Sequence, residues 1–195
     1  YRQMNNFDVI VIGGGHAGCE AAHASARLGS NTLLITMKLD GIGQMSCNPA
    51  IGGIGKSHLA REVDALDGLM CKAADNASLQ SRVLNASKGA AVRATRIQTC
   101  RDEYKKYIQR EIINHKNITV LQSTVKSICF SKQRANGVII DTGETINAKC
   151  IVLTAGTFLD GVIHMGDKTF SAGRAGDKAS IDLEKYFKDV GFDIE

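Results

Sequence analysis

The sequence predicts an α/β protein built around a parallel sheet. A run of β-branched residues over 7–12 ends in three glycines, small apolar residues recur at helical spacing over 16–28, and a second β-rich run occupies 31–36. Two consecutive strands joined by a helix are expected to be parallel in one sheet. The order strand, turn, helix, strand therefore predicts a glycine-rich turn at the carboxyl edge of that sheet.

The later elements are predicted to extend the sheet and to add helices. A glycine-rich loop covers 37–57, followed by a helix over about 58–74, an irregular polar stretch and a long helix over about 97–114. From residue 118 the periodicity becomes that of strands separated by turn signals, and we expect short antiparallel hairpins. These strands are predicted over 118–121, 125–130, 137–141, 144–148 and 150–154.

Composition indicates an ordinary globular chain. The 195 residues are 44% hydrophobic and 23% charged, which excludes disordered, collagen-like and coiled-coil classes. None of the six cysteines forms a CxxC pair, so neither a zinc ribbon nor a thioredoxin-type redox pair is indicated, and reduced thiols are expected. No apolar run approaches the ~18 residues of a membrane span, and the first residues lack the charged-then-apolar order of a secretion signal, so we expect a cytoplasmic protein without a membrane partner.

The turn after the first strand carries a dinucleotide fingerprint. Gly13, Gly15 and Gly18 have the GxGxxG spacing, directly after a strand and at the start of a helix. A turn without side chains lets a pyrophosphate approach the amides at a helix N-terminus, whose partial positive charge stabilises the anion. A tight turn without a ligand is the alternative interpretation. The acidic residue that usually follows the second strand and binds the ribose is missing, because that strand runs into Thr36 and Met37.

The loop over 41–57 contains an imitation of a phosphate-binding P-loop at 50–57. Ala50 replaces the first glycine of that motif, and the preceding residues offer no strand, so we interpret the segment as a glycine-rich wall against a flat ligand. Cys47 lies among polar and loop-forming residues, the partly exposed setting in which a thiolate can act as a nucleophile.

The other cysteines are expected to be inert. Buried, unreactive thiols are the ordinary state of cysteines in apolar helices and strands. The residues in this class are Cys19, Cys71, Cys129 and Cys150.

A basic stretch runs from Arg82 to Arg110. It holds eight cations and two acids, a local charge of +6 in a chain of formal net charge +4. This asymmetry suits polyanion binding, with Lys88, Arg93 and Arg96 as the candidates in a phosphate-binding loop. The part from 101 to 110 is at least as well explained as a solvated helix face.

Four motifs together resemble one family. They are Gly-Gly-Gly-His-Ala-Gly, Gly-Gln-Met-Ser-Cys-Asn-Pro-Ala-Ile-Gly-Gly-Ile-Gly-Lys, Asn-Ala-Ser-Lys-Gly-x-Ala-Val-Arg-Ala-x-Arg and Leu-Thr-Ala-Gly-Thr-Phe-Leu-Asp-Gly. In this order they resemble the N-terminal part of the tRNA uridine 5-carboxymethylaminomethyl modification enzymes, the MnmG or GidA family. The resemblance runs from about residue 7 to residue 180.

The resemblance implies a glutathione-reductase-like FAD-binding fold: a parallel sheet, a helix layer and a three-stranded antiparallel meander, here formed by the strands between Val125 and Ala148. Residues 4–195 would be the FAD-binding domain of a longer protein, and residues 1–3 a cloning scar or upstream residues. Thr154 begins a segment similar to the one that closes such flavin domains. The implied FAD positions are Gly13, Gly14, Gly15, His16, Ala17, Gly18, Val125 and Ser180.

The resemblance also implies the chemistry. In the family, FAD is reduced by NADH, takes a one-carbon unit from methylenetetrahydrofolate and delivers it to the wobble uridine of tRNA, with an amine from glycine or ammonium. Cys47 matches a cysteine thought to attack the uracil ring or to move its protons. The MnmE GTPase would be a partner, the full-length enzyme a homodimer, and the isolated fragment inactive, because the NADH site and a second cysteine would lie beyond Glu195.

Two alternatives stay open at this point. One is the related folate- and FAD-dependent tRNA uracil methyltransferase, whose pattern lacks the Ser-Cys-Asn-Pro-Ala-Ile-Gly-Gly loop. The other is a truncated, non-catalytic module that binds tRNA or a protein partner through the basic stretch from Arg82 to Arg110.

Overall fold

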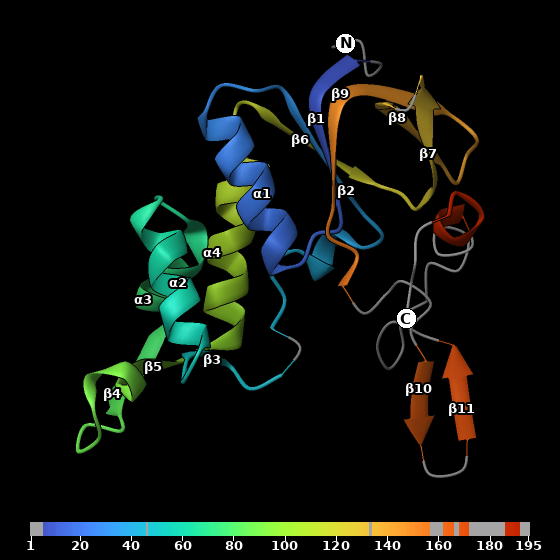
Figure 1. Cartoon of the computed structure of the whole chain (residues 1–195). Helices are drawn as coiled ribbons and strands as arrows, with labels where there is room; N and C mark the ends of the chain where they lie inside the picture. The colour runs from blue at the N-terminus through green and yellow to red at the C-terminus, as the bar shows by residue number, and fades with distance from the viewer. Residues whose placement is uncertain are drawn as a thin grey trace.

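A six-stranded sheet forms the centre of the fold (Figure 1). The computed structural model describes residues 6–45, 47–132, 134–156, 162–165, 168–171 and 186–191. The strands in sheet order are β6 (Ile118–Gln122), β2 (Thr32–Thr36), β1 (Asn6–Ile12), β9 (Thr145–Leu153), β8 (Arg134–Ile140) and β7 (Val125–Ser131). The first four are parallel, whereas β7, β8 and β9 form an antiparallel meander. The predicted fold class is confirmed, with β9 belonging to both parts of the sheet.

Two details of the strand prediction are wrong. β6 does not start a hairpin but pairs in parallel with β2, because α4 returns the chain to the other edge of the sheet. The two strands predicted at 144–148 and 150–154 are one strand, β9. Lys149 lies in its middle, and its ammonium is 2.7 Å from the carboxylate of Asp8 on the neighbouring strand, so the charge reaches solvent without ending the strand.

Each face of the parallel strands packs a separate apolar cluster. On one face Val11 and Leu34 are fully buried against α1 (His16–Arg27) and α4 (Arg101–Ile113). On the other face Ile10 and Leu33 pack against residues of the meander. Alternate residues of one strand point to opposite faces, so this division follows directly from the uninterrupted apolar sequence of β1 and β2.

The helix predicted over 58–74 is two helices, α2 (Lys56–Ala65) and α3 (Leu69–Asn76). The chain turns between them at Asp67, whose φ is +67°, and at Gly68. The carboxylate of Glu20 on α1 accepts hydrogen bonds from the backbone N–H groups of Leu69 and Met70, at 2.9 and 2.6 Å. This acidic cap fixes the start of α3 against α1 and explains the break.

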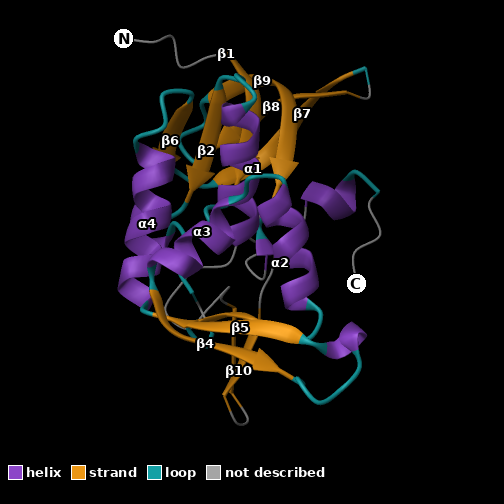
Figure 2. Ribbon diagram, turned by 90° about the vertical axis from the view of Figure 1, so that its left-hand side faces the viewer, coloured by secondary structure: helices purple, strands orange, loops and turns teal. Residues whose placement is uncertain are grey.

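A small antiparallel sheet lies beyond α2 and α3. Its order is β3 (Ala50–Gly52), β5 (Ala94–Thr99) and β4 (Ser78–Leu84), and Figure 2 shows the helices between the β4–β5 ribbon and the large sheet. The irregular stretch predicted before residue 97 is therefore wrong, whereas the long helix predicted over about 97–114 is confirmed as α4 except for its start. The β-branched residues Thr95, Ile97 and Thr99 alternate with Arg96 and Gln98, which is the period of a strand. The helix begins only after Cys100.

Besides a helical turn at 186–189, the described fold contains three further short features. They are the 3₁₀ helices η1 (Leu39–Gly41) and η2 (Ala90–Val92) and the hairpin of β10 (Val162–Met165) with β11 (Lys168–Ser171). Of the helices in the described ranges, none combines the length and apolar character that crossing a bilayer requires.

Candidate functional site

The predicted fingerprint lies at the carboxyl edge of the parallel strands. β1 ends at Ile12 between β2 on one side and β9 on the other. In open α/β sheets, ligands bind in the crevice outside the carboxyl ends of the strands where the chain order diverges in this way. The turn from Gly13 to Gly15 leaves β1 at this crevice, and α1 begins directly after it.

Two glycines of the fingerprint are required by close packing within the chain, whether or not a ligand is bound. Gly13 has a φ of +109°, and a Cβ there would lie 2.6 Å from the carbonyl oxygen of Thr154. A Cβ on Gly18 would lie 1.7 Å from the carbonyl oxygen of Gly13. Because no real Cβ approaches a backbone oxygen so closely, a larger residue at either position would force α1 or β9 away from β1.

Gly15 has no such role within the chain. Its φ of −72° is accessible to any residue, and apart from its two chain neighbours no atom of the described residues lies within 4 Å of the position that its Cβ would occupy. Gly15 is the N-cap of α1, and Ala17 in the first turn is exposed. The first N–H groups of a helix have no partner within it and carry partial positive charge. The geometry at Gly15 therefore fits a pyrophosphate, which needs both the free space and the amides.

Thr154 fastens the end of β9 to the fingerprint turn. Its N–H donates to the carbonyl oxygen of Ile12 at 2.9 Å, and its hydroxyl donates to the same oxygen at 2.8 Å and to that of Gly13 at 3.2 Å. A hydroxyl-bearing residue here holds two strand ends and the turn together. This is the structural role of the Thr-Ala-Gly segment singled out in the sequence.

The end of β2 lacks a carboxylate for the ribose, as the sequence indicates. Thr36 is buried, and its hydroxyl donates to the carbonyl oxygen of Lys38 at 3.2 Å. A Cβ on Gly14 would lie 2.9 Å from the Thr36 hydroxyl oxygen, so this strand end packs directly on the fingerprint. The first acid after β2 is Asp40, and its carboxylate is 2.6 Å from the ammonium of Lys105.

The two remaining predicted cofactor positions differ in what the structure shows. The side chain of Val125 is buried in the apolar cluster under the meander and is therefore not available to contact a cofactor. Val125 follows the segment in which the N–H of Ser123 donates to the carbonyl oxygen of Thr36, which puts it at the same edge of the sheet as the fingerprint. Ser180 lies outside the described residues.

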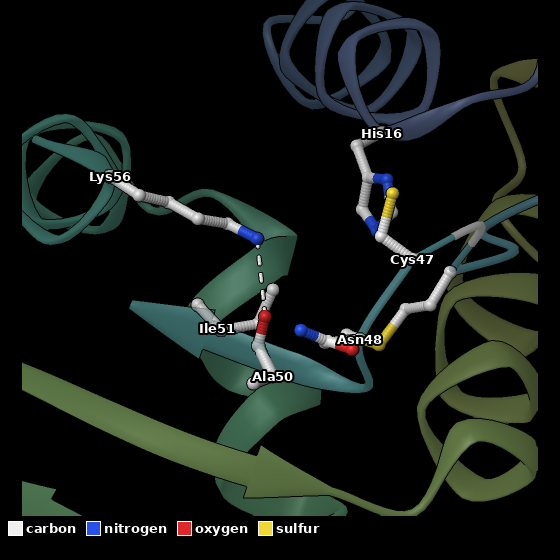
Figure 3. Close-up of a pocket in the computed structure, with 7 residues that line it drawn as sticks. His16, Cys47, Asn48, Ala50, Ile51 and Lys56 are labelled. Carbon is white, nitrogen blue, oxygen red and sulfur yellow. Dashed lines mark hydrogen bonds between the residues drawn. The ribbon is translucent and has the colours of Figure 1, made fainter. Parts of the chain in front are cut away.

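A cavity of about 160 Å³ joins the fingerprint to the loop that contains Cys47 (Figure 3). His16, the first residue of α1, lines it together with Cys47, and Figure 3 shows both side chains extending into the same space. The sequence placed His16 beside a ligand but did not connect it with Cys47. The cavity residues that sequence reasoning missed are Met45, Asn48, Ala50, Ile51 and Lys56.

The Cys47 loop is held by α4 and β5. The guanidinium of Arg101 donates to the carbonyl oxygen of Cys47 at 2.6 Å. Thr99 donates to the carbonyl oxygen of Pro49 from its N–H at 2.7 Å and from its hydroxyl at 3.1 Å. These bonds leave the Cys47 side chain exposed on a fixed backbone.

The sequence argument against a P-loop at 50–57 holds, because residues 47–49 directly before it are not in a strand and the short strand β3 begins only within the motif, at Ala50. The structure does not form that motif. Ser57, whose hydroxyl would bind a metal ion there, instead donates to the carbonyl oxygen of Thr95 at 2.7 Å and accepts from the N–H of Gly53 at 2.9 Å. Lys56 donates to the carbonyl oxygen of Ala50 at 3.1 Å.

The cysteine prediction holds for Cys19 and fails for Cys150. Cys19 is 1% exposed, its thiol donates to the carbonyl oxygen of Gly14 at 3.4 Å, and burial raises its pKa to about 12. Cys71 and Cys129 are half-buried, whereas Cys150 is exposed. α1 packs mainly over β1 and β2, and the residues of β9 beyond it remain open.

The basic stretch divides into parts with different surroundings. On α4, Lys105 pairs with Asp40, Lys106 with Glu103, and Arg110 with Glu111, which supports the solvated helix face. The candidates Lys88 and Arg93 lie in the β4–β5 connection, where the guanidinium of Arg93 donates to the carbonyl oxygen of Ala86 at 3.0 Å. The third candidate, Arg96, lies in the middle of β5.

The arrangement of sheet, fingerprint and Cys47 loop can be compared with known proteins. The model of the family described as glucose inhibited division protein A, GidA, matches residues 8–195. The chain belongs to the GidA family. A structure of Aquifex aeolicus GidA superposes with a TM-score of 0.94 at 42% identity, over 99% of this chain and 32% of that one. The chain thus spans about a third of the length of this GidA.

More distant structures share the fold alone. The GidA-related protein from Thermus thermophilus is 18% identical, with a TM-score of 0.67 over 96% of this chain and 69% of that chain. A probable FAD-dependent monooxygenase from Pseudomonas aeruginosa, pqsL, is 14% identical, with a TM-score of 0.52 over 75% of this chain and 42% of its own length.

The different surroundings of the fingerprint glycines predict different costs of substitution. Gly18→Ala should lower the free energy of unfolding by about 3 kcal/mol or more, because the new Cβ overlaps the Gly13 carbonyl. Gly15→Ala should lower it by less than about 1 kcal/mol, the loss expected at an N-cap with open space around it. Urea unfolding followed by circular dichroism measures both values. Equal losses would show that the packing at Gly18 does not constrain the fold.

Proposed function

We propose that the chain forms the FAD-binding part of an enzyme that modifies a uridine in tRNA. The observation that supports this most strongly is the position of His16. It belongs to the fingerprint segment and also lines the cavity that contains Cys47, so a dinucleotide bound at Gly15 would extend toward the thiol. A cofactor site and a nucleophile that share one cavity are what a flavoenzyme with a covalent step on its substrate requires.

The chain's own residues would divide the work as follows. Gly15 and the amides at the start of α1 would bind the pyrophosphate, and Gly13, Gly18 and Thr154 would hold that turn in place. FAD, when bound, would supply redox chemistry next to the cavity. The Cys47 thiol would attack the uracil ring or exchange protons with it, on a backbone fixed by the hydrogen bond from Arg101.

The co-substrates, the protein partner and the oligomeric state are proposed from family membership. NADH as reductant, methylenetetrahydrofolate as one-carbon donor, the MnmE-type GTPase and a homodimeric assembly belong to this proposal. The Aquifex GidA is about three times as long as this chain, which leaves room in it for the additional binding sites.

FAD binding is tested by substitution of Gly15, whose Cβ position is open among the residues that the structure describes. Gly15→Val should abolish the perturbed visible spectrum of bound flavin, because the side chain would occupy the space of the pyrophosphate. Gly89→Val is the matched control, since Gly89 also has a negative φ and open surroundings but lies in the β4–β5 connection. If Gly15→Val binds FAD as tightly as the control, the fingerprint does not hold the cofactor.

Uridine chemistry is tested at Cys47. In the full-length enzyme, Cys47→Ser should keep FAD binding and NADH oxidation, while wobble-uridine modification falls by about 100-fold or more, because a hydroxyl is a far poorer nucleophile than a thiol near neutral pH. Cys150→Ser is the matched control, because Cys150 is also exposed but lies on β9 and does not line the cavity. Normal modification by Cys47→Ser would remove the thiol from the mechanism.

A further inference from the structure

The small sheet places two arginines directly opposite each other. In the antiparallel register of β4 and β5, Arg82 is the partner of Arg96, and Gln80 is the partner of Gln98. Residues directly opposite in an antiparallel pair lie on the same face, with Cβ atoms about 5 Å apart. One face of this ribbon therefore carries two adjacent guanidinium groups beside two adjacent amides.

No carboxylate in the described part of the chain pairs with these two charges. Like charges directly opposite in a sheet are destabilising. Within the described ranges, neither Arg82 nor Arg96 forms an ion pair. The side chain of Arg82 is exposed, and that of Arg96 is half-buried. Three of the four cations of α4, by contrast, pair with carboxylates. Two unpaired arginines at adjacent strand positions are the arrangement expected where an external anion supplies the missing charge.

The pair forms a row that begins beside the cavity. On β3, Gly52 is the partner of Arg96, and Ala50, two residues earlier and therefore on the same face of the sheet, lines the Cys47 cavity. Neighbouring strands are about 4.8 Å apart, so Arg96 lies about one strand spacing and Arg82 about two from the cavity edge. The first position of the row, on β3, is Gly52, which has no side chain. A Cβ on Gly52 would lie 2.0 Å from the carbonyl oxygen of Thr95.

We propose that Arg96 and Arg82 bind backbone phosphates of the RNA strand whose uridine occupies the Cys47 cavity. A linear row of cations that leads away from the cavity matches an extended polyanion better than a single phosphate group. Gln80 and Gln98 would donate hydrogen bonds to the same strand. The proposal rests on the proposed function, because it takes the substrate to be RNA and its target base to be at Cys47.

Charge-neutral variants of the full-length enzyme test the pair. The test variant is Arg82→Gln with Arg96→Gln, and the matched control is Lys106→Gln with Arg110→Gln, which removes the same charge from α4. Binding of a synthetic RNA hairpin with a loop uridine is measured against salt concentration. The slope of log affinity against log salt should become shallower by about 1.4 in the test variant, at about 0.7 for each phosphate contact of a single strand, and should change little in the control.

A thermal measurement separates binding from structure. Without RNA, the test variant should melt about 1–3 °C higher than the parent, because the repulsion between the two guanidinium groups is gone. The single variant Arg82→Gln, at an exposed position of the edge strand, should show half of the change in salt slope.

The outcomes distinguish the two proposals. If the parent and its control bind the hairpin and the test variant has the parent's salt slope, the arginine row is not the phosphate site. If the test variant binds weakly but also melts well below the parent, the pair is structural and the proposal is overturned. If the parent does not bind the hairpin at all, the proposed RNA-modifying function fails together with the inference.

Discussion

The fold around the site depends on one close approach between α1 and the end of β1. The absence of a Cβ on Gly18 lets the first turns of α1 rest on the Gly13 carbonyl, and the absence of one on Gly13 lets β9 reach the same turn through Thr154. Together these contacts bring a helix N-terminus to the carboxyl edge of the sheet. The same packing places His16, at the start of α1, against the loop that contains Cys47. The proposed anion site and the Cys47 thiol are thus positioned relative to each other by this backbone packing.

The second half of the site depends on elements remote in sequence. Arg101 of α4 and Thr99 of β5 hold the backbone on both sides of Asn48, more than fifty positions earlier in the chain. The small sheet that contains β5 also forms the wall of the cavity through Ala50 and Ile51. The loop therefore presents Cys47 in an exposed but fixed position, which suits a nucleophile that must meet a large substrate.

Local patterns in the sequence were sufficient for the first strand-helix-strand unit and its fingerprint, because each step depends on residues within a few positions of one another. They failed where neighbours in space decide the structure. β5 runs into α4 with only Cys100 between them, so a helical window includes both, and the pairing of Ile97 with β3 decides in favour of a strand. The exposure of Cys150 depends on which helices cover β9, and the pairing of Arg82 with Arg96 depends on strand register. Neither can be read from spacing along the chain.

The central claim is that the fingerprint and the Cys47 cavity form one site. The direct measurement is the rate at which Cys47 reacts with isotope-labelled iodoacetamide, with and without saturating FAD, using Cys150 in the same molecule as the exposed reference thiol. If the two features form one site, bound FAD should slow alkylation of Cys47 several-fold and leave Cys150 unchanged. If the visible spectrum shows that FAD is bound and both thiols react at unchanged rates, the cofactor lies away from the cavity and the claim is contradicted.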